Sequence, residues 1–152
     1  MKILLGVDGS GCSEVAMKEV AARPWPSGSV VRVLYVLEPI VFPALEAVQM
    51  PESYCAAREV AAREELKGVV RELKGNASRG LEIEWEMIPG SAAQVILCEA
   101  EEWGADLIVV GSHGRGRLGS FVLGSASQAV ALHAKCSVKI VRERKSRDSR
   151  RK

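Results

Sequence analysis

The chain has 152 residues, of which 47% are hydrophobic, 26% charged and 5% aromatic, and its formal net charge is +2. This length and composition are typical of one globular domain with an aliphatic core and leave no room for a second catalytic domain. No apolar run approaches the roughly 18 residues of a membrane-spanning helix, which excludes membrane insertion.

The N-terminal part of the chain predicts a strand, a helix and a second strand. Residues 1–8 contain a short apolar run that Gly9-Ser10-Gly11 interrupts. We expect a helix to follow, capped by Ser10 or Ser13. Residues 29–38 are nearly all Val, Leu and Tyr, which is typical of a strand buried on both faces.

The middle of the chain predicts a connection, a long helix and an edge strand. Residues 39–51 hold three prolines and no strong period, whereas apolar residues recur at helical spacing over residues 52–74. Gly75 and Asn76 are expected to end this helix. Residues 81–87 alternate strictly between apolar residues and Glu, which indicates a strand with one face in water, at an edge of a sheet.

The C-terminal part predicts two more helices and two more strands. Ser91 and Gln94 form a capping box that opens a helix, and Gly104 is its expected end. An apolar strand over residues 106–110 and a glycine-rich loop over residues 111–124 follow. A second capping box, Ser125 with Gln128, opens the last helix, and residues 137–141 form the last strand, where Lys139 suggests a second edge.

This alternation of strands and helices predicts a doubly wound α/β fold. We expect a five-stranded parallel sheet in the order 3-2-1-4-5 with helices on both faces, because crossovers of this length are right-handed and the third and fifth strands look like edges. Ligands bind such sheets where the strand order reverses, beyond the carboxyl ends of the strands. The reversal here lies between the first and fourth strands.

Three features bear on redox chemistry, location and partners. The cysteines are widely spaced, without a C-x-x-C pair, so we expect small buried residues that stay reduced and hold no metal: Cys12, Cys55, Cys98 and Cys136. The first residues lack a secretory signal, which favours the cytoplasm. Residues 142–152 carry seven basic and two acidic side chains. We therefore expect one domain over residues 1–143 and a basic, disordered tail over residues 144–152. We do not expect this tail to bind nucleic acid.

Two loops meet at the expected reversal point, residues 8–11 after the first strand and residues 111–119 after the fourth. Glycines in the second loop allow close backbone approach to a ligand, and the helix that follows begins with unpaired N–H groups that favour an anion. These features together predict a phosphate site.

Two common phosphate-binding signatures fit this chain less well. Residues 6–13 resemble a Walker A motif, but Cys12 replaces its lysine and Asp8 would repel phosphate, so we reject this assignment. Gly114, Gly116 and Gly119 match the dinucleotide motif G-x-G-x-x-G, with Glu143 at 24 residues beyond Gly119. Such a unit normally starts a domain, whereas this chain has almost ended.

A longer match is more specific. Gly111-x2-Gly114-x9-Gly124-Ser125 resembles the nucleotide-binding signature of the universal stress protein family, and Val7-Asp8-Gly9-Ser10 resembles the opening motif of that family. The resemblance covers residues 1–143. It implies a dimeric, cytoplasmic, ATP-binding protein with this fold and a role in stress.

The resemblance also assigns roles to residues. It implies that Asp8 and Gly111 contact the ribose and that the backbone of Val36 faces the adenine. The phosphates, with Mg²⁺ or Mn²⁺ held through them, would lie against Gly114, Gly124, Ser125, Ala126 and Ser127.

Each role has a structural alternative. Asp8 could simply cap a turn, Val36 could belong to the core, and the Ser125 capping box would form without phosphate. His113 could be a base or a packing residue. Arg115 and Arg117 could contact phosphates or be solvated. Two residues depart from the family pattern: Arg117 replaces a glycine and Ser137 a proline.

The chain offers no Walker-type lysine or acid for ATP hydrolysis, so we expect binding with at most slow turnover, the nucleotide acting as a conformational ligand. The alternatives are an interaction module of the same fold that binds no nucleotide, and a slow ATP hydrolase. The last strand can pair with its own copy and bury Val138 and Ile140, which predicts a homodimer.

Overall fold

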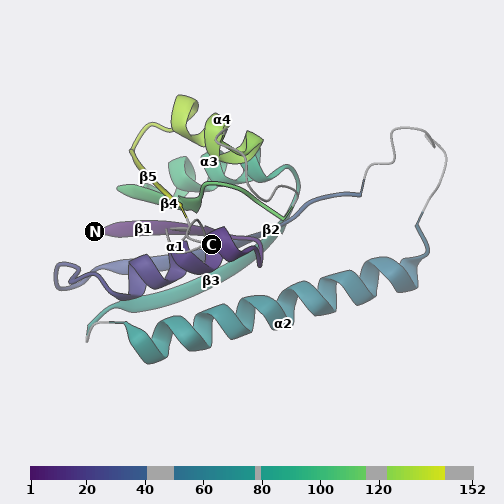
Figure 1. Cartoon of the computed structure of the whole chain (residues 1–152), viewed down its shortest axis with the longest axis horizontal. Helices are drawn as coiled ribbons and strands as arrows, with labels where there is room; N and C mark the ends of the chain where they lie inside the picture. Colours follow the sequence, from purple (N-terminus) through teal and green to yellow (C-terminus); the bar gives the residue numbers. More distant parts are fainter. Residues whose placement is uncertain (41–49, 78–79, 116–122, 143–152) are drawn as a thin grey trace, which may run out of the picture.

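A computed structural model, which describes residues 1–40, 50–77, 80–115 and 123–142, shows one five-stranded sheet between two layers of helices (Figure 1). All strand pairs are parallel and their order is β3-β2-β1-β4-β5, which confirms the predicted fold class. The elements are β1 (Lys2–Val7), α1 (Gly11–Ala21), β2 (Val30–Leu37), α2 (Glu52–Asn76), β3 (Glu82–Pro89), α3 (Ala92–Trp103), β4 (Leu107–Gly111), α4 (Ser125–His133) and β5 (Ser137–Val141).

The two faces of the sheet carry two separate parts of the core. Side chains alternate along a strand, so Ile3 and Leu5 of β1 pack with α1 and α2, while Leu4 packs with α3 and α4. All three are fully buried. Burial on both faces explains why the central strands read as continuous apolar runs.

The helix ends agree with the sequence in two cases and differ in two. Ser10 caps α1, its Oγ accepting from the N–H of Ser13 at 3.2 Å, and Gly104 ends α3 in the left-handed region. Neither predicted capping box forms. Ser91 is the cap of α3, as predicted, but makes no side-chain capping bond, and Ser125 is already the first residue of α4, whose cap is Gly124. The backbone therefore reaches the helical conformation one residue earlier than the second box requires.

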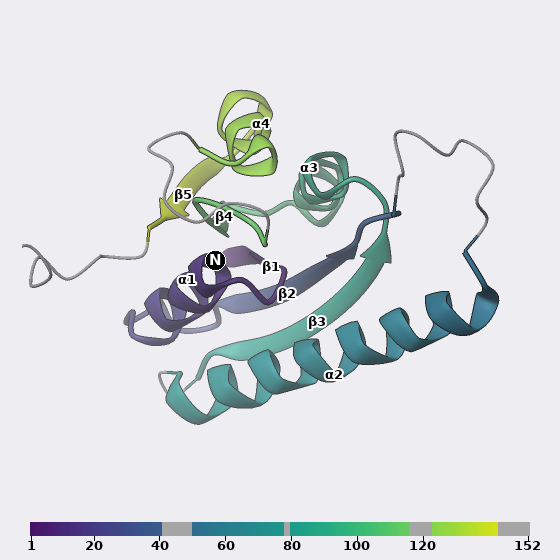
Figure 2. The same ribbon diagram turned by 45° about the vertical axis from the view of Figure 1, so that its right-hand side comes forward.

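The prediction of buried cysteines was wrong for part of the set. Cys55 and Cys98 are exposed, and Cys12 and Cys136 are half-buried. Cys55 lies on the part of α2 that extends beyond the sheet (Figure 2), and Cys98 faces away from the sheet on α3. Within the described ranges all four are free thiols. Helix α2 ends at Asn76, one of the residues expected to end it.

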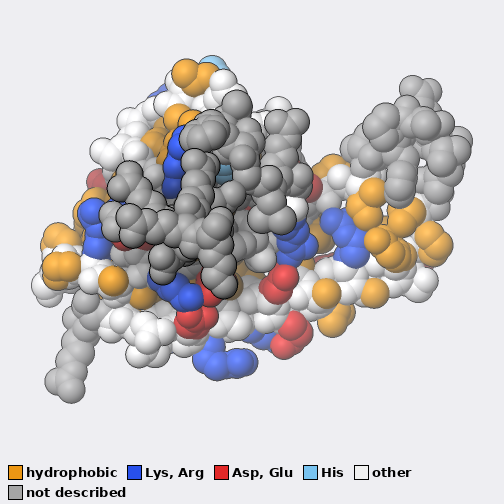
Figure 3. Space-filling view, in the orientation of Figure 1, with side chains coloured by type: hydrophobic (Ala, Val, Ile, Leu, Met, Phe, Trp, Pro, Cys, Tyr) orange, Lys and Arg blue, Asp and Glu red, His pale blue; other side chains and the backbone are white. Residues whose placement is uncertain are grey.

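Two surface features follow from the sheet order. β3 and β5 are the edge strands, as predicted, and Trp85 of β3 remains 41% exposed. The N-terminal part of α2 carries the exposed apolar side chains of Tyr54 and Val60. Apolar side chains also gather at this end of the molecule, at the right of Figure 3. None of the helices in the described part of the chain has the length and apolarity to cross a membrane. The expected tail, residues 144–152, lies outside the described residues.

Candidate functional site

A cleft of about 660 Å³ opens at the carboxyl ends of β1, β2 and β4, where the strand order reverses. This is the position that a doubly wound sheet offers to a ligand. All eight residues predicted for the site line this cleft: Asp8, Val36, Gly111, Gly114, Gly124, Ser125, Ala126 and Ser127. They come from β2, β4 and α4 and from the loops after β1 and β4, so the fold brings together residues that lie far apart in the sequence.

The turn after β1 places a carboxylate in the cleft. Asp8 is half-buried, and its Oδ1 accepts from the backbone N–H of Ser10 at 3.0 Å. Gly9 between them has φ +74°, a conformation that favours glycine. Asp8 therefore does stabilise its own turn, as its structural alternative predicted, while its second oxygen, Oδ2, lies close to Gly114.

Glycines allow the loop after β4 to approach this turn closely. A Cβ on Gly114 would lie 2.8 Å from Asp8 Oδ2, and a Cβ on Gly111 would lie 2.8 Å from the carbonyl carbon of Cys12. Side chains at these positions would collide with the turn and with the start of α1. The predicted meeting of the two loops is confirmed, and it depends on the absence of side chains at both glycines.

The start of α4 directs backbone N–H groups toward the cleft. The N–H of Gly124 donates to the carbonyl of Ser112 at 2.8 Å, and Gly124 has no side chain to cap the helix. The first N–H groups of α4, on Ser125, Ala126 and Ser127, have no partner within the helix. Together they form a site of positive potential for an anion. The Ser127 hydroxyl is already used, because it donates to the carbonyl of Gly111 at 2.8 Å.

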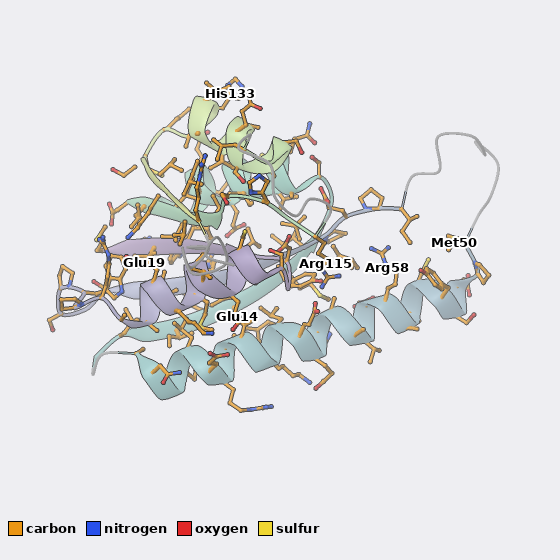
Figure 4. All side chains as sticks on the ribbon, in the orientation of Figure 1. Glu14, Glu19, Met50, Arg58, Arg115 and His133 are labelled. Carbon is orange, nitrogen blue, oxygen red and sulfur yellow. The ribbon has the colours of Figure 1, made fainter. Side chains whose placement is uncertain are left out.

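Arg115 lines the cleft with a side chain that is 56% exposed, and it also has protein partners that the sequence analysis did not predict. Its guanidinium is paired with Glu65 of α2, donates to the Tyr35 hydroxyl at 2.9 Å and donates through Nε to the Asp8 carbonyl (Figure 4). The Tyr35 hydroxyl in turn donates to Glu65 at 3.0 Å. Burial, and then this bond to Glu65, raise the pKa of Tyr35. Arg117 lies outside the described residues.

Other lining residues were missed by the sequence analysis. Arg58 of α2 reaches across the mouth of the cleft and donates to the carbonyl of Glu38 at 3.0 Å (Figure 4), and a Glu38 side-chain oxygen accepts from the N–H of Ala92 at 3.1 Å. Nothing in the local pattern of α2 distinguishes Arg58 from its solvated neighbours. His113 lines the cleft, and its Nδ1 lies 3.0 Å from the Ser112 hydroxyl.

Charged side chains of both signs line the cleft. Its described lining contains two arginines and two acidic residues, Asp8 and Glu38. Among the described residues, no group of three or more His, Cys, Asp or Glu side chains could hold a metal ion. The lining offers a ligand backbone N–H groups, hydroxyls, guanidinium groups and carboxylates.

Comparison with known proteins identifies relatives along the whole domain. The sequence model of the Universal stress protein family matches residues 1–142. A universal stress protein of Thermus aquaticus is 33% identical over 144 residues, an alignment that covers 92% of this chain and 97% of the relative.

Solved structures share the architecture. The structure of the hypothetical protein MJ0577 superimposes with a TM-score of 0.77 at 26% identity, covering 95% of this chain and 97% of that one. A universal stress protein family member from Arabidopsis thaliana, solved with AMP bound, has a TM-score of 0.66 at 20% identity and covers 95% and 92% of the two chains. A universal stress protein solved in complex with cAMP has a TM-score of 0.60 at 21% identity and covers 93% and 96%.

Proposed function

Because this chain belongs to the universal stress protein family, we propose that it binds an adenine nucleotide in the cleft and acts as a nucleotide-dependent regulatory protein. The ligand we propose is ATP, with Mg²⁺ or Mn²⁺ held through its phosphates. The observation that carries the proposal is the convergence of all eight signature residues on one cleft at the reversal of the strand order.

Each part of the nucleotide has a chemically matched partner in this proposal. The Asp8 carboxylate, at the end of β1, accepts hydrogen bonds from the ribose hydroxyls, and the Gly111 backbone lies beside the sugar. The main-chain N–H and C=O groups of Val36 form hydrogen bonds with the edge of the adenine. The phosphates lie against Gly114, Gly124 and the first N–H groups of α4, where the helix dipole favours negative charge.

The solved relatives support the class of ligand. Two proteins of this architecture were solved with AMP or with cAMP, and both compounds contain adenine, ribose and phosphate. A cleft of about 660 Å³ falls within the usual size range of small-molecule sites, roughly 300–1,000 Å³. Adenine nucleotide binding is the function that this geometry supports best.

We propose that turnover is slow or absent. The described lining of the cleft contains no lysine to contact the β- and γ-phosphates. Phosphoryl transfer also needs a positioned water and charge-stabilising donors. The nucleotide then acts by its presence, biasing the conformation of the surfaces that a protein partner contacts.

We also propose a cytoplasmic homodimer formed by β5. This edge strand leaves Val138 and Ile140 half-buried in the single chain, and pairing with a second copy across a two-fold axis would cover them. Sedimentation of the purified protein should give the mass of a dimer, and substitution of Ile140 by Lys should give that of a monomer.

A pair of substitutions at Gly124 tests nucleotide binding. The residue has φ −62° and ψ 153° at the cap of α4, a position that both Asp and Asn favour. The new Cβ would lie 3.3 Å from His113 Cα and 3.4 Å from the Ser112 carbonyl oxygen, so the two variants share the same close contact. Gly124→Asp also places a negative charge against the phosphates, whereas Gly124→Asn adds a side chain of the same shape without charge. By equilibrium dialysis with labelled ATP we expect saturable binding, weakened at least about 30-fold more by Asp than by Asn.

The control is the thermal midpoint, which should be similar in the two variants. Absence of binding by the unmodified protein with Mg²⁺ or Mn²⁺ present would favour the second candidate, an interaction module that carries the glycine loop without a ligand. Equal affinities of the Asp and Asn variants for ATP would indicate that the phosphates do not lie against α4.

A further inference from the structure

The turn that carries Asp8 is held by a pair of charged side chains, of which Arg115 lines the cleft and Glu65 does not. Arg115 donates through Nε to the Asp8 carbonyl, and its Nη2 pairs with Glu65 of α2. The Tyr35 hydroxyl joins the pair, accepting from Arg115 at 2.9 Å and donating to Glu65 at 3.0 Å. Three elements, β2, α2 and the loop after β4, thus converge on the backbone of one turn.

The contact with this turn is close. A Cβ on Gly9 would lie 2.6 Å from Glu65 Oε1 and 2.7 Å from Arg115 Nη2, so the ion pair packs directly against the backbone of the turn. On the opposite side, the Ser10 hydroxyl donates to the carbonyl of His113 at 3.3 Å. The direction of the Asp8 side chain is therefore set by contacts on both sides of its turn.

We propose that Glu65 and Arg115 are positioning residues that orient the Asp8 carboxylate toward the ribose hydroxyls and so set the preference of the protein for ribonucleotides over 2′-deoxyribonucleotides. The inference rests on the proposed function, because it takes Asp8 as the ribose ligand. Glu65 does not line the cleft. It acts through Arg115 and the backbone of Asp8.

Tyr35 is the buried residue of the three and fixes the positions of Arg115 and Glu65. Tyr35 is 5% exposed and its ring belongs to the core, so its hydroxyl is a fixed point to which the two longer side chains are bonded. The Arg115 and Glu65 side chains are 56% and 44% exposed, and an ion pair in that setting adds little to folding stability. Its effect should therefore appear in ligand preference more than in stability.

The test compares ATP with 2′-deoxy-ATP. In the full chain, Glu65→Gln should lower the ratio of the two affinities by about three- to tenfold, the effect of weakening one hydrogen bond that involves a charged group. Tyr35→Phe, which keeps the buried ring and removes the hydroxyl, should lower the same ratio by a smaller factor.

The matched control is Glu59→Gln. It removes an exposed ion pair with Arg63, of 3.0 Å, on the same helix and should leave the ratio unchanged. In an Asp8→Asn background, Glu65→Gln should have no further effect on the ratio, because the group that it orients is no longer a carboxylate.

Three results would overturn the inference. The first is an unchanged ratio in both Glu65→Gln and Tyr35→Phe. The second is an Arg115→Lys variant that loses more affinity for ATP than for AMP at an unchanged sugar preference, which would place Arg115 on the phosphates. The third is a wild-type protein that binds ATP and 2′-deoxy-ATP equally. Failure of the wild-type protein to bind either nucleotide would instead overturn the proposed function, and the positioning role with it.

Discussion

Strands β1 and β4 carry different kinds of residue in the middle of the sheet and at its carboxyl edge. In the middle, Leu4, Leu5 and Ile108 are fully buried, with helices on both sides. At this edge, Asp8 follows β1 and Gly111 ends β4, and both residues line the cleft. One region is filled by large side chains, whereas the other depends on glycines that leave room for the backbone.

This difference separates stability from binding. Apolar area removed from water stabilises the fold, at roughly 25 cal/mol per Å². The carboxyl edge contributes little of that area, because its residues are small or polar. Substitutions in the middle should therefore change the free energy of unfolding, and those at the edge should change affinity.

The largest effect on stability should come from Leu5→Ala. This side chain is 0% exposed between β1 and the α1–α2 layer and does not line the cleft, so its truncation should lower the free energy of unfolding by about 2–5 kcal/mol. Urea denaturation measures the loss. Leu132→Ala makes the same chemical change at a side chain that is 70% exposed and should cost under about 0.5 kcal/mol. Equal losses in the two variants would contradict the assignment of the core.

Gly111→Ala should change both stability and affinity, because Gly111 is packed against α1 and also lines the cleft. The new Cβ would lie 2.8–2.9 Å from backbone and side-chain atoms of Cys12, so α1 must shift away from β4. We expect a loss of about 1–3 kcal/mol, from overpacking, together with weaker ATP binding. Differential scanning calorimetry and equilibrium dialysis on the same preparation measure both.

Gly68→Ala is the matched control for that change. It places the same methyl group in the interior of α2, where no atom lies within 4 Å of the new Cβ. Since alanine favours the helix over glycine, this variant should be more stable by about 0.5–1 kcal/mol, with unchanged affinity. A destabilised Gly68→Ala would mean that the cost at Gly111 does not come from the contact with Cys12.

The smallest effect should come from Glu19, which belongs to neither region. Bonds from Lys139 of β5 and then from Arg23 lower the pKa of the Glu19 carboxyl below its ordinary value of 4.5. Its stabilisation is therefore present above pH 4.5 and is lost as the pH falls through the lowered value. Since the side chain is 39% exposed, Glu19→Gln should cost under about 1 kcal/mol at pH 7.

Urea denaturation at pH 7 and at pH 3 should show this difference shrinking toward zero in acid. A difference that grows in acid would contradict the ion-pair assignment. In 1 M NaCl at pH 7 the difference should also shrink, because salt screens exposed charges.

The fold was predictable because its signals are local. Burial on both faces makes the central strands continuous apolar runs, and alternation with Glu marks β3 as an edge. The eight candidate site residues were assigned through the resemblance to the universal stress protein family, and the structure places them all on one cleft. The glycines among them also carry a local signal, since glycines between a strand and a helix allow close backbone approach.

The errors fall where a local pattern depends on distant neighbours. The exposure of Cys55 depends on how far α2 extends beyond the sheet, and the failed capping box at Ser125 depends on where the backbone of Gly124 is held by Ser112. Neither the extension of α2 beyond the sheet nor the contact between Gly124 and Ser112 can be inferred from the few residues around the pattern.

By itself, the sequence determined the order of strands and helices, the parallel sheet, the reversal point and the glycines that open it, since hydrophobic period and backbone freedom are properties of neighbouring residues. Only the tertiary structure decided that Arg115, which lines the cleft, binds Glu65, Tyr35 and the Asp8 carbonyl. Those partners lie 50 to 107 residues away along the chain. An ion pair of that kind leaves no periodic signal, because it forms only after the packing of α2 against the sheet has brought its members together.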